Sequence, residues 1–160
     1  PASGMIVLRS FGKTYGLPGL RLGFAIAPAS ITARLRAALG PWPVSGAAIA
    51  IGRKALMDLS WLAAVRERLK SDTAAMDHIL ATAGFTLLGG TLLFRLVRHR
   101  GAQAWFGRLA KAGILARRFE KRPDWLRFGI IASDDDRSRF RKALGLSDGA
   151  SAPAARPILA

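Results

Sequence analysis

The sequence of 160 residues contains no cysteine and only two histidines, His78 and His99. Without cysteine, a disulfide framework and a thiolate metal site are both impossible, and a reducing compartment such as the cytoplasm fits the composition. The two histidines lie far apart in the chain, which argues against a histidine-rich metal site. We therefore expect a cytoplasmic protein without a bound metal.

Acidic residues are also scarce, because ten Asp and Glu accompany 25 Lys and Arg and leave a formal net charge of +15. A charge of this size suggests a polyanionic partner such as nucleic acid. Against this, the basic residues are spread along the chain and alternate with apolar residues at helical spacing, and no aromatic-interleaved platform accompanies them. We expect no nucleic-acid partner and keep a basic nucleic-acid-binding fragment as an alternative.

Long hydrophobic runs are missing, although 51% of the residues are hydrophobic. The longest uncharged stretch, residues 37–52, is interrupted by Gly40, Pro41 and Pro43, and the remainder is too short to cross a bilayer. We predict no membrane segment. The apolar excess fits buried strands and a subunit interface instead.

The first half of the chain has the apolar periodicity of two strands and three helices. We expect buried strands at residues 5–8 and 22–27 and helices at residues 28–39, 47–59 and 61–82. Ser45 or Gly46 is expected to cap the second of these helices and Ser60 the third. Asp58 and Asp72 are too isolated to form an acid–base pair, and we interpret both as solvated helix charges.

After Gly84 the apolar period falls to two, which is typical of strands. We expect strands at residues 85–88 and 91–98, with Gly89-Gly90 between them, then a helix at 103–112, strands at 114–116 and 125–131, and a helix capped by Ser133. Beyond residue 146 the composition predicts a disordered tail. The fold class is therefore α/β.

The connection between the first two strands carries a hydroxyl, an amine and a guanidinium, from Ser10, Lys13 and Arg21. Gly12-Lys13-Thr14 looks like the end of a phosphate-binding loop, but the motif's first glycine is replaced by Val7 and no long helix can follow. Lys13 is then either a solvated loop lysine or a Schiff-base lysine for pyridoxal phosphate, with Ser10 and Arg21 on the cofactor's phosphate.

These residues carry a resemblance to a known family. Ser10-Phe11-Gly12-Lys13, followed by Gly16-Leu17-Pro18-Gly19-Leu20-Arg21-Leu22-Gly23, resembles the cofactor-lysine segment of the fold-type-I pyridoxal-phosphate enzymes, the class I and II aminotransferase superfamily. With Arg9 and the segment from Gly40 to Ser45-Gly46, it is most similar to the branch of cobalamin-pathway threonine-phosphate decarboxylases and histidinol-phosphate aminotransferases. The resemblance covers only the carboxyl-terminal half of the family's length.

The resemblance implies a role for each of several residues. Lys13 would hold pyridoxal 5'-phosphate as a Schiff base, and Ser10 and Arg21 would bind its phosphate. Arg127 would clamp the α-carboxylate of the substrate, and Arg117, with Arg118 as a rival, would meet the substrate's own phosphate, which Arg9 could also bind. The implied reaction is decarboxylation of threonine phosphate to aminopropanol phosphate, and the alternative is a histidinol-phosphate-type transamination.

The resemblance also implies a division of the chain. Residues 1–45 would end the large cofactor-binding domain, residues 46–83 would form connecting helices, residues 84–145 a small carboxyl-terminal α/β domain and residues 146–160 the tail. We expect the chain to be a fragment that is inactive alone, because the family's partner for the pyridine nitrogen and its ring-stacking aromatic residue belong to earlier segments. The full-length protein is expected to be a homodimer.

Overall fold

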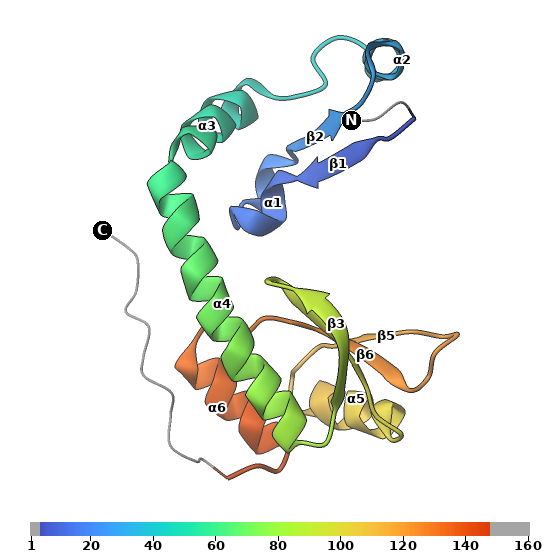
Figure 1. Ribbon diagram of the computed structural model, residues 1–160, viewed down its shortest axis with the longest axis vertical. Coiled ribbons are helices and arrows are strands. Elements are labelled where there is room, and N and C mark those ends of the chain that lie inside the picture. Colours follow the sequence, from blue (N-terminus) through green and yellow to red (C-terminus); the bar gives the residue numbers. More distant parts are fainter. Residues whose placement is uncertain (1–3, 148–160) are drawn as a thin grey trace. The chain divides into compact units, whose positions relative to one another are not determined.

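The computed structural model describes residues 4–147, and the predicted α/β fold class is confirmed (Figure 1). The chain divides into two compact units, and the division falls between Trp61 and Leu62. We call residues 4–61 the loop unit and residues 62–147 the sheet unit. The predicted domain boundaries after residues 45 and 83 stay predictions, and the predicted tail lies outside the described residues from residue 148 onward.

The loop unit begins with two antiparallel strands, β1 (Val7–Ser10) and β2 (Gly23–Ile26), in which Ser10 lies opposite Gly23. Between them the chain forms one turn of helix, α1 (Phe11–Thr14), and a short 3-10 helix, η1 (Pro18–Leu20). Gly16 adopts a positive φ of 65° just after α1, which ends the turn. The two strands and their tight irregular connection are therefore confirmed, although β1 begins and ends two residues later than the predicted strand at residues 5–8.

The burial predicted for these two strands is wrong. Leu8 is 77% exposed and Ile26 is 50% exposed, and every residue of β2 is exposed. The physical reason is that β1 and β2 pair only with each other among the described strands, so their apolar side chains have no second layer of strands beside them. An apolar run alone does not reveal whether a sheet partner exists.

Three helices follow β2 in the chain: α2 (Ala29–Leu39), α3 (Gly46–Met57) and α4 (Leu59–Thr82), which extends into the sheet unit. The Ser45 Oγ accepts a hydrogen bond from the Ala48 backbone N–H at 3.2 Å, so the predicted cap of α3 is confirmed. The predicted cap of α4 is wrong. Asp58, not Ser60, accepts the hydrogen bond of the Trp61 backbone N–H, and Ser60 donates its own hydroxyl to the same carboxylate.

The sheet unit contains a four-stranded antiparallel sheet in the order β3-β4-β6-β5. Its strands are β3 (Thr86–Thr91), β4 (Phe94–Arg98), β5 (Arg117–Arg118) and β6 (Trp125–Gly129), and its helices are α4, α5 (Ala102–Lys111) and α6 (Asp134–Ala143). One face of the sheet packs against these helices and forms a closed core, whose largest members include Met76, Leu109, Leu126, Phe128 and Phe140.

Two details of this sheet differ from the prediction. Gly89 and Gly90 lie within β3 at a shift of register, and the turn falls at Leu92 and Leu93 instead. A Cβ on Gly90 would lie closer than contact distance to the Phe94 carbonyl, so glycine serves a close strand approach here and not a turn. The short strand expected at residues 114–116 is β5, which begins one residue after Ala116.

The prediction that Asp72 is a solvated helix charge is wrong. Asp72 lies in α4 and is only 2% exposed. Its carboxylate forms ion pairs with Arg137 of α6 at 3.1 Å and with Arg68, one helical turn earlier, at 3.5 Å. A carboxylate can be buried when nearby cations compensate its charge. The prediction failed because Arg137 is 65 residues away from Asp72 in sequence, and a local sequence pattern does not include it.

Candidate active site

Lys13 and Ser10 lie at the two ends of the turn that opens the loop between β1 and β2. The Lys13 Nζ donates a hydrogen bond to the Ser10 Oγ at 3.3 Å, and both residues are exposed. Their spacing of three residues brings them together because one turn of α1 separates them. The loop therefore presents an amine and a hydroxyl side by side to any small molecule that reaches it.

Arg21 follows η1 and has a left-handed backbone, with φ of 53°. Its guanidinium donates to the Pro18 carbonyl at 3.3 Å and is exposed, with no carboxylate partner among residues 4–147. Arg21 belongs to the same loop as Ser10 and Lys13, but no direct contact joins it to either. A guanidinium has five N–H donors, so most of those of Arg21 are free for an anion.

Close packing fixes the path of this loop. A Cβ on Gly12 would lie 2.8 Å from the Pro18 Cα, so only glycine permits the two limbs of the loop to approach so closely. The Phe11 backbone N–H donates to the Leu22 carbonyl at 3.3 Å, and a Cβ on Gly52 of α3 would lie 2.5 Å from Leu22 Cδ2. Leu22, at the end of the loop, is thus bonded to Phe11 and packs closely against Gly52 of α3.

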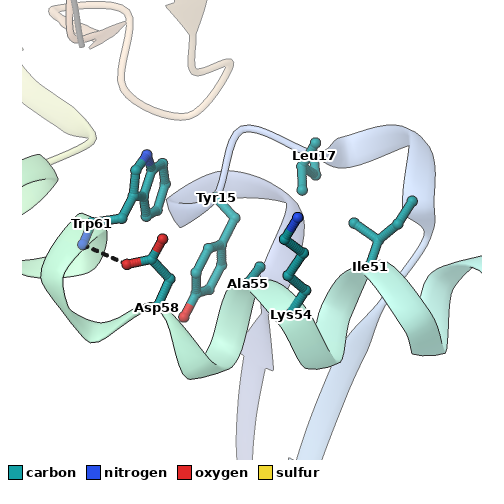
Figure 2. Close-up of a pocket in the computed structure, with 7 residues that line it drawn as sticks. All are labelled: Tyr15, Leu17, Ile51, Lys54, Ala55, Asp58 and Trp61. Carbon is teal, nitrogen blue, oxygen red and sulfur yellow. Dashed lines mark hydrogen bonds between the residues drawn. The ribbon is translucent and has the colours of Figure 1, made fainter. Parts of the chain in front are cut away.

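A small cavity of about 240 Å³ lies beside the loop (Figure 2). It is lined mainly by apolar atoms, and its charged lining residues are Lys54 and Asp58. Figure 2 shows the Tyr15 and Trp61 rings facing each other at one end of this cavity, with the Asp58 carboxylate bonded to the Trp61 backbone. Those two bonds, from the backbone of Trp61 and the hydroxyl of Ser60, lower the pKa of Asp58.

The sheet unit carries the two arginines that the sequence associates with substrate. Arg127 is in β6, directly opposite Arg117 of β5, so the two side chains lie on the same face of the sheet. This face is opposite to the one on which Leu126 and Phe128 join the core. The Arg127 guanidinium stacks over the Phe94 ring at 4.6 Å, and neither arginine has an acidic partner among residues 4–147.

The two rivals for the substrate phosphate lie in different surroundings. Arg118 pairs with Leu126 in the register, and its guanidinium stacks over Phe106 of α5 at 5.2 Å, on the helix-covered side. Arg117 stacks instead over Phe119 at 5.6 Å. In the loop unit, Arg9 is exposed and lies opposite Phe24 in the β1–β2 pair.

Sequence reasoning missed Tyr15, Trp61 and the cap at Asp58. The spacing Asp58-Leu59-Ser60-Trp61 resembles an N-terminal cap, and it could have located the start of α4 correctly. The Tyr15–Trp61 contact had no such signal, because η1, β2, α2 and α3 separate the two residues in the chain.

Some kinds of site are absent from the part of the chain that the structure describes. Residues 4–147 contain no group of three or more His, Cys, Asp or Glu side chains that could hold a metal ion. Within the same residues, no helix has both the length and the apolar character needed to cross a membrane.

Comparison with known proteins connects the loop to a family. The family model of the class I and II aminotransferases matches residues 1–144. A threonine-phosphate decarboxylase from Sinorhizobium sp is 45% identical over 143 residues, which cover 88% of this chain and 41% of the relative. A histidinol-phosphate aminotransferase from Chromohalobacter salexigens is 32% identical, over 82% of this chain and 39% of the relative.

The fold agrees with these sequence matches. The structure of a histidinol-phosphate aminotransferase from Sinorhizobium meliloti, solved in complex with pyridoxal-5'-phosphate, is similar with a TM-score of 0.72 at 25% identity. The match covers 87% of this chain and 40% of that one. The chain spans about two fifths of the length of the curated relatives it matches. The chain belongs to the class I and II aminotransferase family.

Proposed function

We propose that the protein to which this chain belongs is a pyridoxal-phosphate-dependent decarboxylase of threonine phosphate, and that Lys13 is its cofactor lysine. The observation that carries the proposal is the Lys13 Nζ at 3.3 Å from the Ser10 Oγ, on a loop that also carries Arg21, in a member of this family. A relative at 45% identity bears the name threonine-phosphate decarboxylase.

The loop residues fit the chemistry of the cofactor. Lys13 would hold the aldehyde carbon of pyridoxal phosphate through its ε-amine, and its exposure leaves the amine accessible. The Ser10 hydroxyl and the free N–H groups of Arg21 would donate to the cofactor's phosphate. Gly12 and Gly23, opposite Ser10, allow backbone to approach closely at this point.

When bound, the cofactor supplies an electron sink for the bond that breaks at the substrate's Cα. The protein would decide which bond breaks through the way its residues hold the substrate. Arg127 would bind the carboxylate of the substrate and fix its orientation. In the decarboxylation, CO2 would leave and Cα would take a proton in its place; in the alternative transamination, the Cα proton would leave and the Lys13 amine would accept it.

The arginine pair of the sheet unit supports an anionic substrate. Arg117 and Arg127 lie opposite each other on neighbouring strands, where like charges repel unless an anion lies between or beside them. A substrate with a carboxylate and a phosphate has one negatively charged group for each of the two arginines. In this proposal Arg127 binds the carboxylate in a two-pronged manner and Arg117 binds the phosphate, whereas Arg118 faces the helices and Arg9 is a second candidate for the phosphate.

The assembly and location complete the proposal. A homodimer would place a second chain beside the loop unit, whose exposed apolar strand residues favour a covering partner. The absence of cysteine favours the cytoplasm, where cobalamin-pathway enzymes of this kind would act. The second candidate reaction is histidinol-phosphate transamination, which the 32% identical relative favours.

The test is Lys13→Ala in the full-length protein, with Lys70→Ala as the matched control. Lys70 is an exposed lysine that pairs with Glu67 on the surface, and such a pair has little energetic value. We expect Lys13→Ala to lose the visible absorption of the lysine-bound cofactor and all turnover of threonine phosphate, and Lys70→Ala to keep both. Retained absorption in Lys13→Ala would overturn the proposal.

The products separate the two reactions. An amine with release of CO2 identifies the decarboxylase, and a keto acid identifies the aminotransferase. Binding to duplex DNA that weakens steeply with salt, together with no cofactor absorption, would favour the nucleic-acid alternative.

A further inference from the structure

The helical turn that carries Lys13 is too short to be stable by itself. α1 has four residues, and two of the backbone hydrogen bonds at its end are from the Tyr15 N–H to the Phe11 carbonyl at 3.2 Å and from the Gly16 N–H to the Lys13 carbonyl at 3.4 Å. Helices of this length are unstable in water without tertiary contacts. The position of the Lys13 amine therefore depends on what packs against this turn.

Aromatic rings stack along one side of the turn. The Phe11 and Tyr15 rings are 4.3 Å apart with planes at 13°, and the Tyr15 and Trp61 rings are 5.5 Å apart with planes at 10°. Phe11 is buried and anchors one end of this three-ring stack. Tyr15 directly follows the turn, so the stack joins both ends of α1 to the start of α4.

Trp61 is itself held in place. Its backbone N–H donates to the Asp58 carboxylate at 2.9 Å, and the Ser60 hydroxyl donates to the same oxygen at 2.8 Å. The bonded carboxylate fixes the first turn of α4, and Figure 2 shows the Trp61 ring directed toward Tyr15 beside the cavity. A continuous series of contacts thus runs from Asp58 through Trp61 and Tyr15 to the turn of Lys13.

We propose that Trp61 is a positioning residue, which acts through Tyr15 to hold the Lys13 turn closed and the Lys13 amine beside Ser10. The proposal rests on the assignment of Lys13 as the cofactor lysine. Trp61 touches neither Lys13 nor Ser10 through any contact in the described residues, so its effect passes through the ring stack. Without Trp61, the turn opens more often and the amine loses its fixed position.

The experiment compares Trp61→Ala, Trp61→Phe and Trp42→Ala in the full-length protein. Trp42 is the matched control because it is a tryptophan of the same unit that is 92% exposed and has no ring contact among the described residues. Hydrogen exchange of the Tyr15 and Gly16 amides, measured without cofactor, reports the opening of the turn directly. Cofactor retention is measured separately from the visible absorption of the lysine-bound cofactor and its dependence on pH.

We expect Trp61→Ala to speed exchange at Tyr15 and Gly16 about five-fold, which is what the loss of one ring stack provides. The same variant should bind the cofactor more weakly by a similar factor and shift the pH profile of its visible absorption. Trp61→Phe keeps a ring at this position and should restore both properties nearly to normal. Trp42→Ala should change neither.

Three results would overturn the proposal. The first is unchanged exchange at Tyr15 and Gly16 in Trp61→Ala, and the second is exchange that rises equally across β1, β2 and α3, which would mean general unfolding. The third is faster exchange without any change in cofactor absorption. If Trp61→Ala does not fold, Tyr15→Leu removes the middle ring, with Tyr15→Phe as its control. Failure of the cofactor-lysine assignment itself appears separately, as retained absorption in Lys13→Ala.

Discussion

The two units of the chain bury their apolar residues very differently. In the sheet unit, Val97 and Leu126 are fully buried, and three helices close one face of the sheet. In the loop unit, β1 and β2 expose Leu8 and Ile26, while the loop between them carries Lys13. The comparison indicates that the sheet unit contains most of the folding stability of the described chain, whereas the loop unit carries the reactive amine on a tightly packed connection.

The largest expected effect tests this contrast in stability. Leu126→Ala removes a fully buried side chain from the centre of the sheet unit and should lower the free energy of unfolding by about 4 kcal/mol. Leu8→Ala, the same substitution on an exposed strand, should change it by less than about 0.5 kcal/mol. Urea denaturation of both variants measures the difference. If both variants lost the same free energy of unfolding, Leu8 would be covered in solution. The proposed difference in burial between the two units would then be wrong.

The next effect concerns the ion pairs that join α4 to α6. Arg137 donates to Asp72 and Asp134, and although burial acts to lower its pKa, these carboxylates raise it, so the guanidinium stays charged. Arg137→Met should leave the buried Asp72 with Arg68 as its one remaining cation among residues 4–147, and should lower the free energy of unfolding by about 3 kcal/mol.

A second substitution sharpens this result. Asp72→Leu added to Arg137→Met removes the uncompensated charge, and we expect it to restore most of the lost stability. Arg139→Met serves as control, because Arg139 is exposed and its bond to the Gly113 carbonyl is long, at 3.4 Å. A loss in the control as large as that in Arg137→Met would mean that the charge of α6, and not the buried pair, determines stability.

The third effect tests whether the sheet unit takes part in substrate binding, through the face of the sheet that carries Arg127. Arg127→Lys keeps the positive charge and loses the planar fork of the guanidinium. We expect kcat/KM for threonine phosphate to fall about 100-fold in the full-length protein, since one charge-assisted hydrogen bond is lost. Arg118→Lys, on the helix-covered side, should have little effect. An unaltered kcat/KM in Arg127→Lys would remove this arginine from the substrate site.

The contrast between the units also shows what sequence can predict here. Local signals located most helices and strands and brought Ser10 and Lys13 together, because one turn of helix links them. The burial of Asp72 was missed because its main partner, Arg137, is distant in sequence. The exposure of β1 was missed for a similar reason, since burial of a strand depends on neighbours that its own residues do not specify.

Glycine was the least reliable local signal. Gly89 and Gly90 have the composition of a turn, yet they serve a close approach of two strands within β3. Gly12 looks like part of a phosphate-binding loop, an interpretation that the sequence itself argues against. In the structure, glycine is required there because a Cβ would come too close to the backbone of Pro18. Both positions depend on the distance to another segment of the chain, which a local pattern does not contain.

The smallest expected effect is a pH dependence at the junction of the two units in sequence. The bonds from Trp61 and Ser60 lower the pKa of Asp58 below its ordinary value of 3.8. Because the pKa of Asp58 is lower in the folded state than in the unfolded state, its charged form stabilises the fold at pH values above the unfolded-state pKa. This contribution is lost as the pH falls through the folded-state pKa. Asp58→Asn keeps a capping oxygen but has no group that titrates. As the pH is lowered from about 4 to about 3, the free energy of unfolding should therefore fall less in the variant than in the wild type. Unfolding measured against pH in both proteins gives the comparison, and parallel curves would show that the Asp58 cap does not contribute in solution.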